Sequence, residues 1–235
     1  MCQPLALIDR VKPFLQPYTL EEIALPSKTK TGNGWRCEII GQGIRVSTSR
    51  RQYGDYRLLQ EPYCKKCAYP GVSTSECGWH WDDAPLERTY AVGAYIPTRS
   101  RESKEDLLTQ HILGLKKFSS YAVPLGLAMA LCMENFYSEL LKFSILVPVP
   151  KYPSELKHNK SKNFKYNQAT ELAKVIGQQT GITVSEPVFK TEPRSQRNLG
   201  WEQRKEGMQD IYSAEGADLS GKSVILIDDT RTSGA

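Results

Sequence analysis

The sequence predicts an α/β protein in which a parallel β-sheet follows a small module that binds a metal. A continuous aliphatic run at 224–227 shows no alternation and is typical of a strand buried on both faces of a parallel sheet. A second such run at 143–147 precedes a helical pattern at 169–179. Upstream, between residues 64 and 80, cysteines and a histidine recur at the spacing of metal ligands.

The composition is that of a folded protein. Its 235 residues are 40% hydrophobic and 24% charged, which excludes a disordered chain and suits either one large domain or two smaller ones. We expect two domains, an N-terminal region at 1–88 and a larger domain at 89–235. The net charge of +5 suits a polyphosphate or nucleic-acid partner, although charge alone does not choose between them.

No segment has the pattern of a signal peptide or of a membrane span. The longest apolar window, 121–133, is shorter than the roughly 20 residues that a spanning helix needs, and it contains Pro124 and Gly126. We therefore expect a cytoplasmic protein with reduced thiols instead of disulfides.

The first third of the chain combines short helices with a hairpin. Apolar residues keep a helical spacing over 5–23, but Pro13 and Pro17 divide this pattern into two short helices. The runs 35–40 and 44–48 alternate in polarity and are separated by glycines, which predicts a β-hairpin.

The metal site is predicted from two pairs of possible ligands. Cys64 and Cys67 form a C-x2-C pair, and Cys77 and His80 form a C-x2-H pair. Two such pairs can close a tetrahedron around Zn²⁺, and a site with no open position would be structural. Cys37 or Cys2 could replace His80 as the fourth ligand. Aromatic and basic residues around these pairs suit a nucleic-acid or protein contact, or only a solvated surface, about equally.

Helices and strands then alternate. The stretch 90–95 is a short strand candidate, and 103–117 is an amphipathic helix that begins at Ser103 and carries His111 at its surface or boundary. A helix at 125–141 carries Cys132, which we expect to be a buried, inert thiol. After the helix at 169–179, a further strand is expected at 184–190.

The strand at 143–147 leads into a loop that begins at Pro148 and continues as a basic run. Such a run is most often a solvated loop, but ligands collect beyond the carboxyl ends of parallel strands. If the strands at 143–147 and 224–227 are neighbours, their two loops face one crevice. Three arginines in the polar segment before the last strand suit a phosphate there: Arg194, Arg197 and Arg204.

The last strand runs into paired carboxylates and a small, hydroxyl-rich turn. Asp228 and Asp229 can accept hydrogen bonds from the two hydroxyls of a ribose, while the turn at 230–235 can wrap backbone N–H groups around a phosphate. The residues of this turn are Thr230, Arg231, Thr232, Ser233, Gly234 and Ala235.

The segment SVILIDDTRTSGA at 223–235 resembles the phosphoribosyl-pyrophosphate (PRPP) signature of type I phosphoribosyltransferases. Over 63–235 the chain resembles, more narrowly, the competence protein ComF family, which joins a cysteine-based zinc module to a phosphoribosyltransferase-like domain. The matching features are VPVP at 147–150, Asn167-Gln168-Ala169, Arg194, Gln196, Leu199, Arg204, Tyr212 and IDDTRTSGA. The chain departs from that family at NFKYNQ, which lacks an Arg-Gly pair, at Gly207, and at the histidine of the zinc module.

The resemblance implies a type I phosphoribosyltransferase-like open parallel sheet with helices on both faces, preceded by a zinc-ribbon-like α+β module. It implies that Asp228 and Asp229 bind the ribose and favour its cationic transition state, with Mg²⁺ accompanying PRPP. It places the 5′-phosphate at 230–235, and the pyrophosphate near Arg194, Arg204 and a loop made of Val149, Pro150, Lys151 and Tyr152. The chain stops inside this motif, and we expect a complete phosphate loop to open a further helix.

Two functions follow from this reading. The first is a glycosyltransferase that moves phosphoribose from PRPP to a nitrogenous base or amine, with the acceptor left open. The alternative is a non-catalytic protein that binds a nucleotide or nucleic acid and contacts partners in DNA uptake or processing.

Overall fold

A computed structural model describes two-fifths of the N-terminal region and most of the larger one. The described residues are 34–60, 89–96, 104–142, 144–159, 164–193, 211–214 and 219–230, with short pieces at 3–4, 23–24, 63–64, 68, 71, 73, 75 and 77. They form a mixed α/β fold with a three-stranded parallel sheet. None of the described helices is long and apolar enough to cross a membrane.

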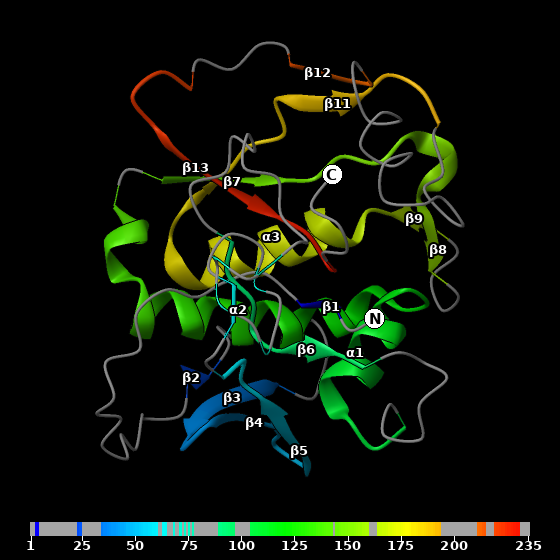
Figure 1. The fold of residues 1–235 in the computed structure, drawn as a ribbon. Coiled ribbons are helices and arrows are strands. Elements are labelled where there is room, and N and C mark those ends of the chain that lie inside the picture. Colours follow the sequence, from blue (N-terminus) through cyan, green and yellow to red (C-terminus); the bar gives the residue numbers. More distant parts are fainter. Residues whose placement is uncertain are drawn as a thin grey trace.

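The elements follow one another as Figure 1 shows. The strands are β1 (Gln3–Pro4), β2 (Ile23–Ala24), β3 (Trp35–Ile40), β4 (Gly43–Thr48), β5 (Arg51–Arg57), β6 (Ala94–Tyr95), β7 (Ser144–Pro148), β8 (Lys157–Asn159), β9 (Phe164–Tyr166), β10 (Thr183–Val184), β11 (Val188–Lys190), β12 (Tyr212–Ala214) and β13 (Ser223–Ile227). The α-helices are α1 (Leu107–Leu115), α2 (Ala122–Phe136) and α3 (Gln168–Thr180), and the 3-10 helices are η2 (Ser119–Tyr121), η3 (Ser138–Leu141) and η4 (Pro153–Glu155).

The predicted hairpin is confirmed and belongs to a larger antiparallel sheet with the order β2-β3-β4-β5. Gly41 turns the hairpin with a φ of +57°, a conformation that glycine adopts without steric cost. No local pattern predicts β5, because its residues are mostly polar and exposed and only Tyr56 is buried in the core. The two short helices expected over 5–23 lie almost wholly outside the described residues.

The parallel sheet has β7 in the middle, between β10 and β13. The predicted strands at 143–147 and 224–227 are therefore neighbours, with Ile225 opposite Leu146 and Ile227 opposite Pro148. The expectation that the last strand is buried on both faces is wrong. Val224 and Leu226 are 43% and 44% exposed, whereas Ile227 is fully buried. The described helix that packs on this sheet, α3, covers the opposite face.

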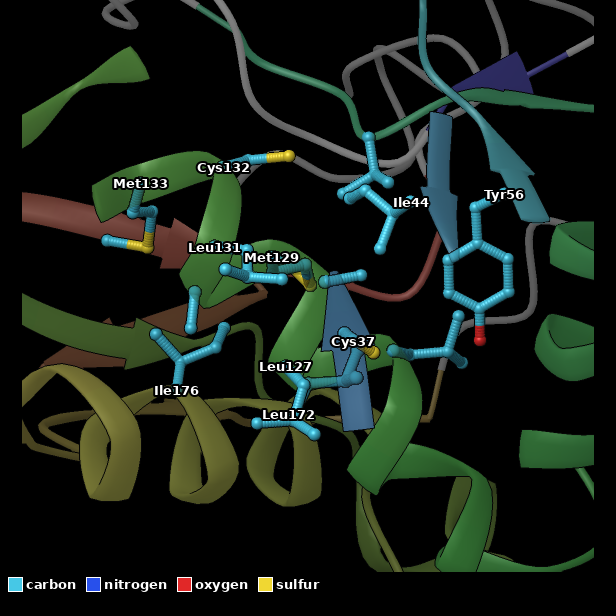
Figure 2. Close-up of a cluster of buried hydrophobic side chains, with 14 of the residues drawn as sticks. Cys37, Ile44, Tyr56, Leu127, Met129, Leu131, Cys132, Met133, Leu172 and Ile176 are labelled. Atoms are coloured by element: carbon cyan, nitrogen blue, oxygen red, sulfur yellow. The ribbon is translucent and has the colours of Figure 1, made fainter. Parts of the chain in front are cut away.

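The core lies between the two sheets and is built around α2. This helix is apolar on all sides, as expected for a buried helix, because α3 packs on one side of it and β3 on the other. Figure 2 shows Leu172 and Ile176 of α3 approaching Leu127 and Leu131 of α2. Cys132 is fully buried and burial raises the pKa of its thiol to about 12, in agreement with an inert role.

The helix boundaries differ in detail from the predicted ones. α1 begins after Asp106 instead of Ser103, because the Asp106 carboxylate accepts a hydrogen bond of 2.7 Å from the Thr109 N–H. The predicted helix at 125–141 divides into α2 and η3. The predicted strand at 184–190 divides into β10 and β11, which belong to different sheets.

His111 is buried, and the expectation of a surface or boundary position is wrong. Its side chain lies among the rings of Trp35, Tyr53, Tyr56 and Tyr121, and its Nδ1 is 2.5 Å from the Tyr56 hydroxyl. Burial lowers the pKa of His111 to about 4, so the ring is neutral at pH 7. The antiparallel sheet packs on this face of α1, and the amphipathic pattern of the helix alone could not show that.

We expect Gly126→Ala to destabilise the protein by about 1–2 kcal/mol, although alanine is the better helix former. A Cβ at this position would lie 2.7 Å from the Val175 Cβ and 3.3 Å from the Leu172 carbonyl oxygen. The clash costs about 1–3 kcal/mol and outweighs a helix-propensity gain of about 1 kcal/mol. Urea unfolding measures the difference. Gly34→Ala is the control, because a Cβ there meets no atom within 4 Å; equal effects of both changes would contradict close packing of α2 on α3.

Candidate functional site

The loops that leave β7 and β13 meet at the carboxyl edge of the parallel sheet. The Val149 N–H donates a hydrogen bond of 2.9 Å to the Ile227 carbonyl, which extends the pairing of the two strands by one step. Just beyond it, the Lys151 Nζ lies 3.8 Å from Oδ1 of Asp229. The predicted neighbourhood of the Pro148 loop and the acidic pair is thus confirmed, since the two strands run parallel in register.

The acidic pair, Asp228 and Asp229, is largely shielded from solvent. Asp229 is 6% exposed and Asp228 is half-buried, and the Asp228 carboxylate accepts a hydrogen bond of 2.8 Å from the Asp229 N–H. Burial, and next the charge of Asp229, raise the pKa of Asp228 well above its usual range, whereas the ammonium of Lys151 opposes that rise. A group that donates hydrogen bonds to Asp228, or that carries developing positive charge, would stabilise its ionised form and oppose this rise.

The N-terminus of α3 holds the Pro148 loop from the other side. Asn167 caps the helix by accepting from the Ala169 N–H, and its Nδ2 donates a bond of 2.8 Å to the Val149 carbonyl. The Lys151 Nζ donates a bond of 2.6 Å to Oε1 of Gln168, a side chain with no exposed surface. Neither Asn167 nor Gln168 is assigned a role by the sequence alone, although an Asn-Gln pair that opens a helix after a basic run is a signal for one.

A two-stranded antiparallel sheet, β11 with β12, lies across the parallel sheet from α3 (Figure 1). Lys190 of β11 donates bonds of 2.8 and 2.9 Å to the two carboxylate oxygens of Glu155, which ties this sheet to η4. In β12, burial and then the charges of Asp228 and Glu155 raise the pKa of Tyr212 to about 12. The hydroxyl of Tyr212 is therefore protonated at pH 7. The charges that disfavour its ionised form include that of Asp228 in the acidic pair.

A cavity of about 450 Å³ separates the Pro148 loop from β11. Its lining includes Pro150, Lys151 and Tyr152 of the loop, Val188 and Phe189 of β11, and Asn167 and Thr170 at the start of α3. Its volume lies in the range of small-molecule sites. Lys151 belongs to this cavity and also contacts Asp229, so the cavity adjoins the acidic pair.

The structure brings together part of the predicted site. Lys151 contacts Asp229, and Val149 pairs with Ile227, the residue before Asp228. Pro150 and Tyr152 belong to the same loop and line the cavity, and Thr230, after the acidic pair, is half-buried. The remaining predicted phosphate ligands lie outside the described residues: Arg194, Arg204, Arg231, Thr232, Ser233, Gly234 and Ala235.

Half of the predicted zinc site is described. Cys64 and Cys77 are both buried, whereas Cys67 and His80 lie outside the described residues. The Ala68 N–H donates a bond of 2.6 Å to the Cys64 carbonyl, and Ala68 adopts a left-handed φ of +55°.

Cys37 lies in the core. Its thiol donates to the Pro124 carbonyl at 3.5 Å, and burial raises its pKa. No group of three Cys, His, Asp or Glu residues able to hold a metal occurs within the described residues, which include Cys37, Cys64 and Cys77 but not Cys67 and His80. The fourth zinc ligand, whether His80, Cys37 or Cys2, therefore stays a prediction.

We expect Cys64→Ser to remove zinc and to unfold the surrounding module, because a structural zinc site supplies much of the folding free energy of a small module. Elemental analysis of purified protein measures the metal. His80→Ala tests the fourth ligand, and Cys37→Ser, which lies in the core, is the control that should retain zinc. Full retention in Cys64→Ser would contradict the site.

Comparisons of the chain with family models, with curated proteins and with solved structures found no match.

Proposed function

We propose that this protein binds PRPP, or a related phosphoribosyl ligand, at the carboxyl edge of its parallel sheet and transfers the phosphoribosyl group to a nitrogenous base. The observation that carries the proposal is the contact of Lys151 with Asp229, across the ends of two neighbouring parallel strands. It joins a cation from a loop suited to pyrophosphate to a carboxylate pair suited to a ribose. Open α/β sheets bind their ligands at this edge.

Different residues of the site bind different parts of the ligand. Asp228 and Asp229 accept hydrogen bonds from the ribose hydroxyls and stabilise positive charge that develops at the sugar as pyrophosphate leaves. The turn that begins at Thr230 holds the 5′-phosphate, while Lys151 and the backbone of its loop meet the pyrophosphate. Mg²⁺ would enter with the pyrophosphate and neutralise part of its charge, and we assign it no side-chain ligand. The chain's own task is to position the reactants and to exclude water from them.

Isothermal titration with Mg²⁺-PRPP tests the proposal. We expect saturable heat at micromolar to millimolar ligand, and a lack of heat above background at millimolar ligand would overturn it. The alternative, binding of nucleic acid without catalysis, predicts affinity for a DNA oligonucleotide that falls steeply with salt. PRPP should compete with DNA only if both use the acidic edge.

A further inference from the structure

We infer that Gln168 is a positioning residue that fixes the ammonium group of Lys151 beside the acidic pair. It acts through one hydrogen bond, from Lys151 Nζ to Gln168 Oε1 at 2.6 Å, while the same ammonium lies 3.8 Å from Asp229 Oδ1. The importance of this arrangement for ligand binding rests on the proposed function. The arrangement itself can be tested without a ligand.

The position of Gln168 suits it to restrict the movement of the Lys151 ammonium group. It is the first residue of α3, its side chain has no exposed surface, and the helix is anchored behind it by the fully buried residues Ala169, Leu172 and Ala173. A buried side chain in a packed helix has few rotamers to choose from. Lys151 is partly exposed on a loop and has a long, flexible side chain, so without this acceptor its ammonium would sample several positions.

The amide of Gln168 is retained at a cost. Its Oε1 accepts from Lys151, but its Nε2 is buried and makes no hydrogen bond within the described structure. A buried donor without a partner destabilises the fold, and an apolar residue of the same shape would avoid that effect. The hydrogen bond to Lys151 is therefore the interaction that distinguishes glutamine from methionine or leucine at this position.

Holding Lys151 in place favours the ionised form of Asp228, against the burial and the neighbouring carboxylate that raise its pKa. The titratable and charged groups that face Asp228 are Asp229 on its own loop, Lys151 on the β7 loop and Tyr212 on β12, and Asp229 also faces Tyr166 of β9. Of these, Lys151 carries the positive charge. An ammonium close to a carboxylate favours its ionised form, so displacement of Lys151 shifts the pair toward protonation.

The test is a ¹³C NMR titration of the aspartate side chains in the ligand-free protein, comparing wild type with Gln168→Met. We expect the apparent pKa of the acidic pair to rise by about half a unit to one unit in Gln168→Met, which is part of the 1–3 units that a fixed opposite charge contributes. Gln178→Met is the matched control, because Gln178 is an exposed glutamine of the same helix, and it should leave the titration unchanged.

A double-mutant cycle separates positioning from a general structural effect. If Gln168 acts through Lys151, Gln168→Met should not shift the titration further in a Lys151→Met background. An unchanged titration in Gln168→Met, or equal and additive shifts in both backgrounds, would overturn the inference. In a parallel PRPP titration at pH 7 we expect Gln168→Met to weaken binding about 3- to 10-fold, and wild-type protein that binds no PRPP would contradict only the proposed function.

Discussion

Asp228→Asn combined with Asp229→Asn should abolish PRPP binding, with an affinity loss of at least about 100-fold by isothermal titration. Each carboxylate would give up a charge-assisted hydrogen bond to a ribose hydroxyl, and each such bond contributes about 1.5–3 kcal/mol. The amide that replaces it has nearly the same shape, so the strand and loop should keep their positions. Zinc content, measured on the same sample, should not change.

The Asp228→Asn change alone should not lower the stability of the fold at pH 7, in contrast to its effect on binding. The folded-state pKa of Asp228 is raised by burial and by Asp229, so the folded protein binds this proton more tightly than the unfolded chain does. Asp228 therefore stabilises the fold most at low pH, and this contribution is lost as the pH rises through the folded pKa. At pH 7 we expect Asp228→Asn to unfold at a temperature equal to or above that of wild type. Loss of binding together with a large fall in melting temperature would mean that the change disrupted the fold, and unchanged binding would remove the acidic pair from the site.

The stability of the protein should fall between pH 6.5 and pH 4 because of His111. Its folded-state pKa of about 4 lies below the ordinary value of 6.5, so the unfolded chain binds the proton first as the pH falls. The stability that the neutral ring contributes is complete above pH 6.5. It decreases by about 2 kcal/mol at pH 5 and by about 3 kcal/mol at pH 4.

His111→Asn tests this expectation, because asparagine can accept a hydrogen bond from the Tyr56 hydroxyl but does not titrate. The variant should be less stable than wild type at pH 7, since it fills less of the space among the four aromatic rings. Between pH 7 and pH 5, the free energy of unfolding by urea should fall less in the variant than in wild type. The difference between the two decreases should be about 2 kcal/mol. If the free energy of unfolding changed with pH by the same amount in both proteins, His111 would not titrate as its burial requires.

These two predictions concern opposite ends of one packed structure. The antiparallel sheet packs on His111 of α1, α2 packs on that sheet and on α3, and α3 presents Gln168 to the Lys151 loop. A change in the core, such as Gly126→Ala, therefore acts at the interface of the two helices that connect these ends. It should lower stability without changing the charges of the acidic edge.

The local sequence was sufficient to predict several elements and one relation between them. Aliphatic runs predicted β7 and β13, glycines between alternating runs predicted the β3–β4 hairpin, and helical spacing predicted α1, α2 and α3 with small errors at their ends. These signals are local because each depends on side chains within a few residues. The meeting of Lys151 with the acidic pair was also predictable, since neighbouring parallel strands bring their carboxyl ends to one edge.

The sequence by itself determined which segments carry the chemistry of this protein: a carboxylate pair after a strand, a basic loop after another, and cysteine pairs at zinc spacing. Only the tertiary structure decided that His111 is buried among aromatic rings, that the Cys37 thiol contacts the Pro124 carbonyl, that Val224 and Leu226 remain exposed, and that Gln168 holds Lys151. The physical reason is the same in each case. Burial, and the pKa shifts and hydrogen bonds that follow from it, depend on groups distant in sequence, and no local pattern contains that information.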